Sequence, residues 1–174
     1  MIREFLNKLK NIKLVPNADK MKPNTFRKFL NLWPPFLGAG VKVTKIADDY
    51  SSADVQMKLH KWNKNYVGTH YGGSLFSMTD PFYALILIKS LGKDYIVWDK
   101  ASDIKFKKPG KGIVSAHFNI AKEKLKEIKD LADTQDKVEP TFIVQIKDEA
   151  GDVVAEVSKT LYVRRKDKPP KPRS

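Results

Sequence analysis

Hydrophobic and polar residues alternate along several stretches of the chain, as they do in strands that bury one face. The clearest case is segment 53–59, where apolar residues stand at every second position and polar residues fill the positions between them. Further alternating or extended segments are predicted as strands at residues 41–46, 95–107, 114–120, 141–147 and 153–163. The pattern therefore predicts about six strands, and the last two are joined by a hairpin turn.

Residues 2–14, 24–32 and 121–132 are predicted as helices. A fourth segment, residues 74–91, is almost entirely apolar yet contains one acid, Asp80. A helix that is apolar all round must be enclosed, and the sheet is the element that can enclose it. We therefore predict an α+β fold in which a curved antiparallel sheet of about six strands is wrapped around one long central helix. Open sheet edges favour pairing with a second copy, so a homodimer is expected.

The acid in the apolar segment has two explanations. In the first, the helix starts at Pro81 and Asp80 is its N-cap, because aspartate followed by proline is a strong helix start. In the second, the helix starts at Gly73 or Ser74, and Asp80 lies two turns inside it at a bend caused by Pro81. An acid at such a bend is a candidate general base, and the glycines at the helix start would offer backbone amides to a developing negative charge. The local sequence does not choose between the two.

The chain has 174 residues, which is enough for one domain with a substantial core. We expect residues 1–36 to form a helical extension, residues 37–164 the main domain and residues 165–174 a disordered basic tail. There is no cysteine, which excludes disulfides and a cysteine nucleophile and suits a cytoplasmic location. The longest apolar stretch is too short to cross a bilayer, so no membrane span is expected.

The formal net charge of +13 would attract phosphate groups of any kind. The lysines and arginines are not concentrated on one helix and do not alternate with aromatic residues, so we expect no specific binding of nucleic acid. No group of histidine, aspartate and glutamate has the spacing of metal ligands, so no metal site is expected. The sequence contains neither GxGxxG nor GxxxxGK(S/T), the two glycine-rich motifs that bind nucleotide phosphates.

A resemblance to a known family is carried by residues 65–80, NYVGTHYGGSLFSMTD. This segment resembles the signature of hot-dog-fold thioesterases of the phenylacetyl-CoA type, and residues 101–112 resemble the strand that follows it. The asparagine, the GT pair, the GG pair and the aspartate of the signature fall on Asn65, Gly68, Thr69, Gly72, Gly73 and Asp80. The nearest form of the signature belongs to a branch known only as uncharacterised thioesterases.

The resemblance implies a hot-dog fold and an acyl-CoA thioesterase that uses no cofactor, its coenzyme A thioester being the substrate. It implies that Asp80 acts as base or nucleophile, and that the amide of Gly72, beside Gly73, polarises the thioester carbonyl. Asn65 would orient the substrate or a water molecule. It also implies a homodimer, or a dimer of dimers, in which Asn65 and Gly72 of one subunit face Asp80 of the other.

Two positions depart from the pattern of the family. The histidine before the glycine pair is replaced by Tyr71, with His70 one place earlier, and a serine or threonine of the family falls on Asp99. A second carboxylate near Asp80 would raise one pKa of the pair. Alternatively, Asp99 is a solvated residue paired with Lys93 or Lys100. These departures leave a second hypothesis open, namely a non-catalytic hot-dog protein that binds acyl-CoA or a fatty acyl chain.

Substrate contacts are expected from His70, Tyr71 and Asp99, and from lysines at the turn after the third strand. Lys105, Lys107 and Lys108 surround that turn, and coenzyme A carries several phosphate charges. Either these lysines bind the nucleotide end of an acyl-CoA, or they only keep the turn solvated. For His70, a hydrogen bond to the loop beside the glycine turn is the alternative explanation, and it is preferred to a catalytic role.

Overall fold

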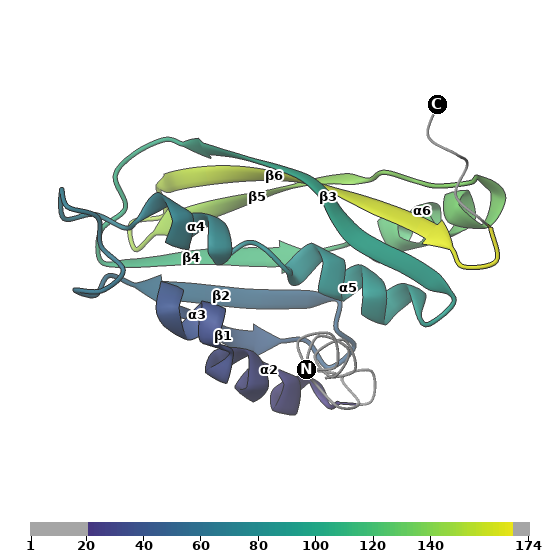
Figure 1. Cartoon of the computed structure of the whole chain (residues 1–174), viewed down its shortest axis with the longest axis horizontal. Helices are drawn as coiled ribbons and strands as arrows, with labels where there is room; N and C mark the ends of the chain where they lie inside the picture. Colours follow the sequence, from purple (N-terminus) through teal and green to yellow (C-terminus); the bar gives the residue numbers. More distant parts are fainter. Residues whose placement is uncertain (1–20, 169–174) are drawn as a thin grey trace, which may run out of the picture.

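The computed structural model describes residues 21–168, which form one six-stranded antiparallel sheet curved around a central pair of helices (Figure 1). The strands are β1 (Val41–Ile46), β2 (Ser52–Lys58), β3 (Tyr95–Phe106), β4 (Ile113–Asn119), β5 (Thr141–Asp148) and β6 (Val153–Arg165). The helices are α2 (Pro23–Leu32), α3 (Pro34–Ala39), α4 (Gly72–Ser77), α5 (Phe82–Leu91) and α6 (Lys122–Thr134). The predicted α+β class and the six strands are confirmed. The helix predicted at residues 2–14 lies outside the described residues.

The strands run in the order β1-β2-β4-β5-β6-β3, with α4 and α5 against one face (Figure 1). The alternating residues of β2 and β4 bury that face, as in the pair of Val55 and Ala116, which are directly opposite one another. The centre of the Phe118 ring on β4 lies 4.7 Å from the centre of the Phe82 ring on α5. The core therefore forms between the helices and the concave face of the sheet. No helix within residues 21–168 is long and apolar enough to cross a membrane.

The two edges of the sheet differ. Along the β1 edge, the side chain of Asn31 on α2 accepts a hydrogen bond from the backbone N–H of Val43 and donates one to its carbonyl. Helix α2 therefore covers this edge and satisfies its backbone groups. At the other edge, β3 pairs only with β6 within the described residues, and most of its twelve residues are exposed. A long open edge of this kind is suited to pairing with another strand.

Strand β3 contains a bulge that changes which of its residues face the helices. Its register with β6 shifts between Asp99 and Ala101, so Lys100 is the extra residue. Asp99 lies opposite the buried Leu161, and Ser102 lies opposite the buried Lys159. Odd-numbered residues before the bulge and even-numbered residues after it therefore share the concave face. Simple alternation along β3 does not predict this switch.

The apolar segment 74–91 is not one continuous helix. Helix α4 ends at Ser77 and α5 begins at Phe82, with Asp80 in the turn between them. The carbonyl of Ser77 accepts a hydrogen bond from the N–H of Asp80, and Pro81 has no N–H with which to continue the helical pattern. The central helix is therefore interrupted, and neither explanation of Asp80 is complete. The helix starts at the glycine pair, yet Asp80 lies in a break, and its side chain makes no cap hydrogen bond to α5.

The described part of the N-terminal extension shares the core of the sheet. Phe26, Leu30 and Phe36 of α2 and α3 are buried in the same cluster as the strands.

At the other end, residues 165–168, which the sequence assigned to a disordered tail, make specific contacts. Lys168 donates hydrogen bonds to three carbonyls at the C-terminal end of α6, because those groups have no partner within the helix.

Candidate active site

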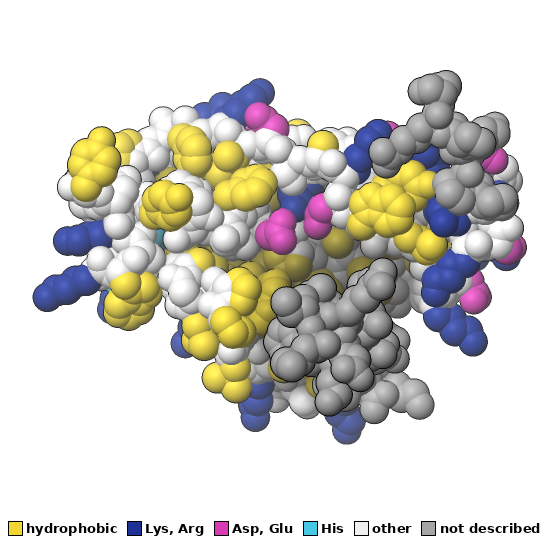
Figure 2. Space-filling model, viewed as in Figure 1, with side chains coloured by type: hydrophobic (Ala, Val, Ile, Leu, Met, Phe, Trp, Pro, Cys, Tyr) yellow, Lys and Arg dark blue, Asp and Glu magenta, His cyan; other side chains and the backbone are white. Residues whose placement is uncertain are grey.

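Three charged side chains meet at the break between α4 and α5. The ammonium nitrogen of Lys159 lies 3.1 Å from Oδ1 of Asp80 and 3.1 Å from Oδ1 of Asp99. The lysine side chain is 1% exposed, whereas the side chains of Asp80 and Asp99 are 53% and 31% exposed. On the face shown in Figure 2, acidic side chains lie in the middle, over this junction, with hydrophobic side chains around them. The cluster therefore consists of two accessible carboxylates above a buried cation.

Each member of the cluster comes from a different element. Lys159 occupies a concave-face position of β6, where the neighbouring positions on that face are the buried Val157 and Leu161. The bulge in β3 brings Asp99 to the same face, and the helix break brings Asp80. The expected alternative pairing of Asp99 with Lys93 or Lys100 is not observed, because Lys100 pairs with Glu139 and Asp99 pairs with Lys159.

The environment of Asp99 changes its acidity. Burial raises the pKa of the Asp99 carboxyl above its ordinary value, the ion pair with Lys159 opposes that rise, and the charge of Asp80 adds to it. The second oxygen of Asp80, Oδ2, accepts no hydrogen bond from residues 21–168. The cluster thus offers one carboxylate oxygen that is free to accept a proton from water.

The glycine pair lies at the other end of α4. Within the described residues, the backbone N–H groups of Gly72 and Gly73 donate to no protein acceptor, whereas those of Ser74 and Leu75 both donate to the carbonyl of Tyr71. A Cβ atom on Gly72 would lie 3.0 Å from the ring of Phe106, so a side chain here would have to displace that ring. Glycine therefore leaves two amides available beside an aromatic ring.

A pocket of about 440 Å³ opens beside Gly72. It is lined by five of the predicted site residues, namely Asn65, His70, Gly72, Lys107 and Lys108, together with residues of the loop after β3. Of the other predicted site residues, Tyr71 is exposed and its ring covers Gly73, while Lys105 faces away from the helices, opposite Glu156. The structure therefore brings the predicted residues together in two groups, one around Gly72 and one around Asp80.

His70 is buried at the wall of this pocket. Its Nε2 lies 3.2 Å from the carbonyl of Gly112, and because a carbonyl only accepts hydrogen bonds, Nε2 carries the proton. Burial lowers the pKa of the imidazole below its ordinary value, while the bond to Gly112 opposes this. The other ring nitrogen, Nδ1, is buried and has no partner in the described chain. The side chain of His70 therefore ties its loop to the turn between β3 and β4, and its Nδ1 has no partner within residues 21–168.

Asn65 organises the loop that precedes the pocket. Its side-chain oxygen accepts hydrogen bonds from the backbone N–H groups of Val67 and Thr69, and its amide nitrogen donates to the hydroxyl of Thr69. Asn63, which the sequence analysis missed, is 2% exposed and ties the same loop to the carbonyls of Lys58 and Ala39. These contacts hold the backbone that leads into Gly72.

The three lysines of the predicted cluster have different partners. Lys108 lies 2.6 Å from both Asp148 and Asp152, and these hydrogen-bonded ion pairs raise the pKa of its ammonium group. Lys105 and Lys107 have no acidic partner within residues 21–168, and Lys107 lines the pocket. Lys107 is therefore the lysine best placed for an anionic group of a ligand.

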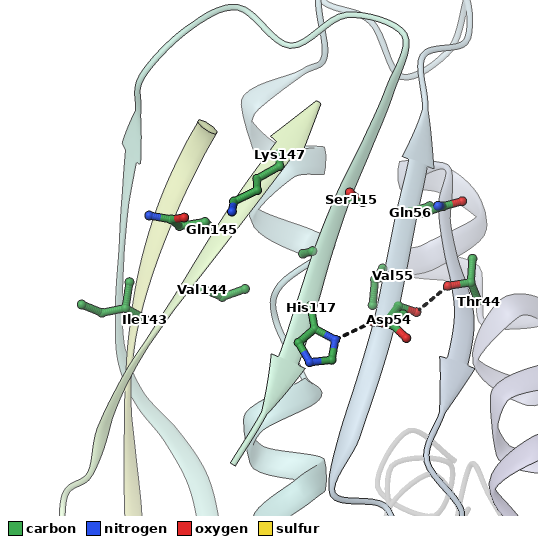
Figure 3. A pocket seen from close by; sticks show the side chains of 11 residues that line it. Thr44, Asp54, Val55, Gln56, Ser115, His117, Ile143, Val144, Gln145 and Lys147 are labelled. Atoms are coloured by element: carbon green, nitrogen blue, oxygen red, sulfur yellow. Dashed lines mark hydrogen bonds and ion pairs between the residues drawn. The ribbon is translucent and has the colours of Figure 1, made fainter. Parts of the chain in front are cut away.

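A larger hollow, of about 710 Å³, lies on the outer face of the sheet, where β4 and β5 separate (Figure 3). Its floor carries Gln56, Ser115, Gln145 and Lys147, and the exposed His117 is paired with Asp54. None of the predicted site residues lines it. Within the described chain, no three His, Asp or Glu side chains are grouped as a metal site, here or elsewhere.

The sequence analysis missed Lys159, although the sequence contains a signal. Lys159 stands at a position of β6 that alternation assigns to the buried face, between two apolar residues of that face. A lysine at such a position needs a buried or bridging partner. Its partners are 79 and 60 positions away along the chain, so no local pattern connects them.

Comparison with solved structures identifies the architecture as the hot-dog fold. A protein of unknown function from Pseudomonas aeruginosa, named a probable thioesterase, is similar over 82% of this chain and 95% of its own, with a TM-score of 0.74 and 20% identity. A thioesterase from Haemophilus influenzae is similar over 84% and 92%, with a TM-score of 0.61 and 13% identity. A hypothetical thioesterase from Streptococcus pneumoniae, in a variant with alanine in place of an aspartate, covers 72% and 92%, with a TM-score of 0.51 and 22% identity.

At these low sequence identities, the structural similarity shows a shared fold. The chain belongs to the family described as a domain of unknown function, DUF4442, whose model matches residues 23–163. That match includes α2 and α3 together with the sheet. No curated protein matches the chain.

Proposed function

We propose that the protein is an acyl-CoA thioesterase in which Asp80 is the general base. The observation that carries the proposal is the accessible carboxylate of Asp80 at the break of the central helix, held through Oδ1 by a buried lysine, with no partner for Oδ2 among residues 21–168. The names of similar folds, which include thioesterases, support the same reaction class. The lack of cysteine supports a cytoplasmic location.

In this mechanism, Oδ2 of Asp80 accepts a proton from a water molecule, and the water oxygen forms a bond to the thioester carbonyl carbon. The carbonyl oxygen becomes negatively charged and accepts hydrogen bonds from the amides of Gly72 and Gly73. When the carbon–sulfur bond breaks, the electron pair leaves with sulfur, which takes the proton from Asp80. The products are a carboxylic acid and free coenzyme A, and the enzyme returns to its starting state.

The site is formed by two protomers. Gly72 opens α4 and Asp80 lies in the turn beyond its other end, so the helix between them, with a rise of about 1.5 Å per residue, separates them by roughly 9 Å in one protomer. That distance is too long for both to act on one carbonyl group. The open edge of β3, with its exposed Trp98 and Phe106, favours pairing with a second copy that would bring the two ends together. We therefore propose a homodimer, alone or as a dimer of dimers.

The pocket beside Gly72 would hold the coenzyme A part of the substrate. His70 lines this pocket and would contact the substrate, and Asn65 would keep the loop in place for it. Lys107, with Lys105 and Lys108 nearby, would bind phosphate groups. No resident cofactor is needed, because the thioester itself supplies the leaving group.

The test is release of free thiol from a panel of short, medium, long and aromatic acyl-CoAs, followed with a thiol-reactive chromophore. We expect turnover of at least one member of the panel and a kcat lowered by roughly 100-fold or more in Asp80→Asn. Absence of thiol release from every acyl-CoA by the folded wild-type protein would reject the proposal.

A second candidate function is binding of acyl-CoA or a fatty acyl chain without turnover. It is favoured by the ion pair between Asp80 and Lys159, which occupies one oxygen of the proposed base. Thermal stabilisation by acyl-CoA without any thiol release would support this function.

A further inference from the structure

Lys159 is the one Lys, Arg, Asp or Glu residue that is buried within residues 21–168. Burying an ammonium group is costly unless charged partners compensate, and an apolar side chain of similar length is often cheaper in a core. Packing alone therefore does not explain a lysine at this position. Its ammonium reaches both Asp80 and Asp99 and lies 5.9 Å from the centre of the Phe76 ring.

We propose that Lys159 is a positioning residue of the catalytic site, which holds Asp80 oriented through Oδ1 and ionised despite the neighbouring carboxylate of Asp99. This inference rests on the proposed function and adds to it the residue that sets the pH range of the base. Lys159 does not touch the substrate. It acts through Asp80.

The geometry carries the inference. Both carboxylate oxygens lie 3.1 Å from the same nitrogen, so they are within about 6 Å of each other. Two carboxylates this close raise one pKa of the pair strongly when no cation lies between them. With Lys159 in place the cluster carries one net negative charge, whereas without it the cluster would carry two or would bind a proton. A protonated Asp80 cannot act as the base.

No other charged side chain of the described chain joins this cluster. β6 contributes Lys159, β3 contributes Asp99, and α4 contains no titratable side chain. On α5, the hydroxyl of Tyr83 binds the carbonyl of Ile143, and Lys89 lies over the rings of Phe26 and Tyr50. Within residues 21–168, Lys159 and Asp99 are therefore the charged neighbours of Asp80 in this cluster.

The experiment compares Lys159→Met, Asp99→Asn and the double variant, using the acid limb of the pH profile of kcat/KM. Lys159→Met should move this limb to higher pH by about 1 unit or more, because the cation is lost. Asp99→Asn should move it to lower pH, because the repelling anion is lost. The double variant removes one charge of each sign and should lie close to the wild type. Lys42→Met and Asp103→Asn, at exposed positions of β1 and β3, serve as matched controls and should leave the limb in place.

If Lys159 only stabilised the fold, its replacement would lower the melting temperature and leave the acid limb of the pH profile where it is. That result would overturn the inference while leaving the thioesterase proposal intact. If Lys159→Met does not fold, the double variant is compared with Asp99→Asn, because these two proteins differ only in the lysine; loss of the lysine should move the acid limb to higher pH, and an unmoved limb would overturn the inference. If the wild type releases no thiol, an NMR titration of the Asp80 carboxyl carbon tests the same expectation, with the midpoint at the lowest pH in Asp99→Asn and at the highest pH in Lys159→Met. The same midpoint in all of these proteins would also overturn the inference.

Discussion

The hydroxyl of Tyr83 on α5 donates a hydrogen bond of 3.0 Å to the backbone carbonyl of Ile143 on β5. The two residues meet where the sheet lacks a strand-to-strand contact, because β4 and β5 pair only over residues 114–116 and then separate. The ring of Tyr83 packs edge-on against Phe118 of β4 and is stacked on Phe142 of β5. A helix side chain thus fills the gap between two strands and satisfies a carbonyl that the missing pairing leaves free.

Tyr83→Phe should lower the free energy of unfolding by about 1 kcal/mol at neutral pH, because the hydrogen bond from Tyr83 to the carbonyl of Ile143 is lost. Urea denaturation measures this, with Tyr66→Phe at a fully exposed position as the control. An effect no larger than that of the control would show that the hydrogen bond adds nothing to stability.

The same tyrosine predicts a loss of stability in alkali. Burial raises the pKa of Tyr83 to about 12, whereas a phenol in the unfolded chain ionises near pH ~10. Its contribution is complete below pH ~10 and is lost as the pH rises towards about 12, since the unfolded state then holds fewer protons. Between these values, the wild type should lose more stability with rising pH than Tyr83→Phe does. Parallel pH dependences of the two proteins would contradict the assignment.

Asp80→Asn should reduce kcat for thiol release by roughly 100-fold or more, because an amide cannot accept the proton from water. The folded state should persist, since Asp99 remains as a partner of Lys159. The assay is steady-state kinetics with the best acyl-CoA of the panel, together with a melting curve, and Asp103→Asn is the matched control. A variant that keeps wild-type kcat would remove Asp80 from the mechanism.

A site shared between protomers predicts complementation between two inactive variants. Gly72→Val places a side chain against the ring of Phe106 and blocks the amides, while Asp80→Asn removes the base. Co-expression of the two in equal amounts should restore about a quarter of the wild-type activity, because half of the dimers are mixed and each has one intact site. If both essential groups came from the same protomer, the mixture would remain inactive.

Lys105→Gln combined with Lys107→Gln should raise KM for acyl-CoA several-fold, leave kcat nearly unchanged and weaken the dependence of KM on salt. These two lysines are chosen because they have no acidic partner in the described chain, whereas replacing Lys108 would also break its pairs with Asp148 and Asp152. Lys42→Gln on β1 controls for the loss of surface charge. An unchanged KM would mean that the lysines only solvate the turn.

Much of the fold follows from local patterns. The alternation in β2 and β4 depends only on which side chains point to each face, and the observed strands begin and end within two residues of the expected ones. The glycine pair and Asp80 were visible as chemistry because they interrupt an apolar segment. Local patterns failed where one element depends on another. They missed the bulge at Lys100, which is a property of the pairing with β6, and they did not choose between a helix start and a bend at Pro81.

By itself, the sequence determined the class of fold, the apolar segment at its centre, and the glycine pair and the acid on which the proposed chemistry depends. Only the tertiary structure decided what surrounds Asp80. Residues from α4–α5, β3 and β6 meet there, and the buried Lys159 joins them although its partners are far away in the chain. The physical reason is that periodicity reports the face of a single element. A buried ion pair depends on strand register and on burial, and these exist only after the chain has packed.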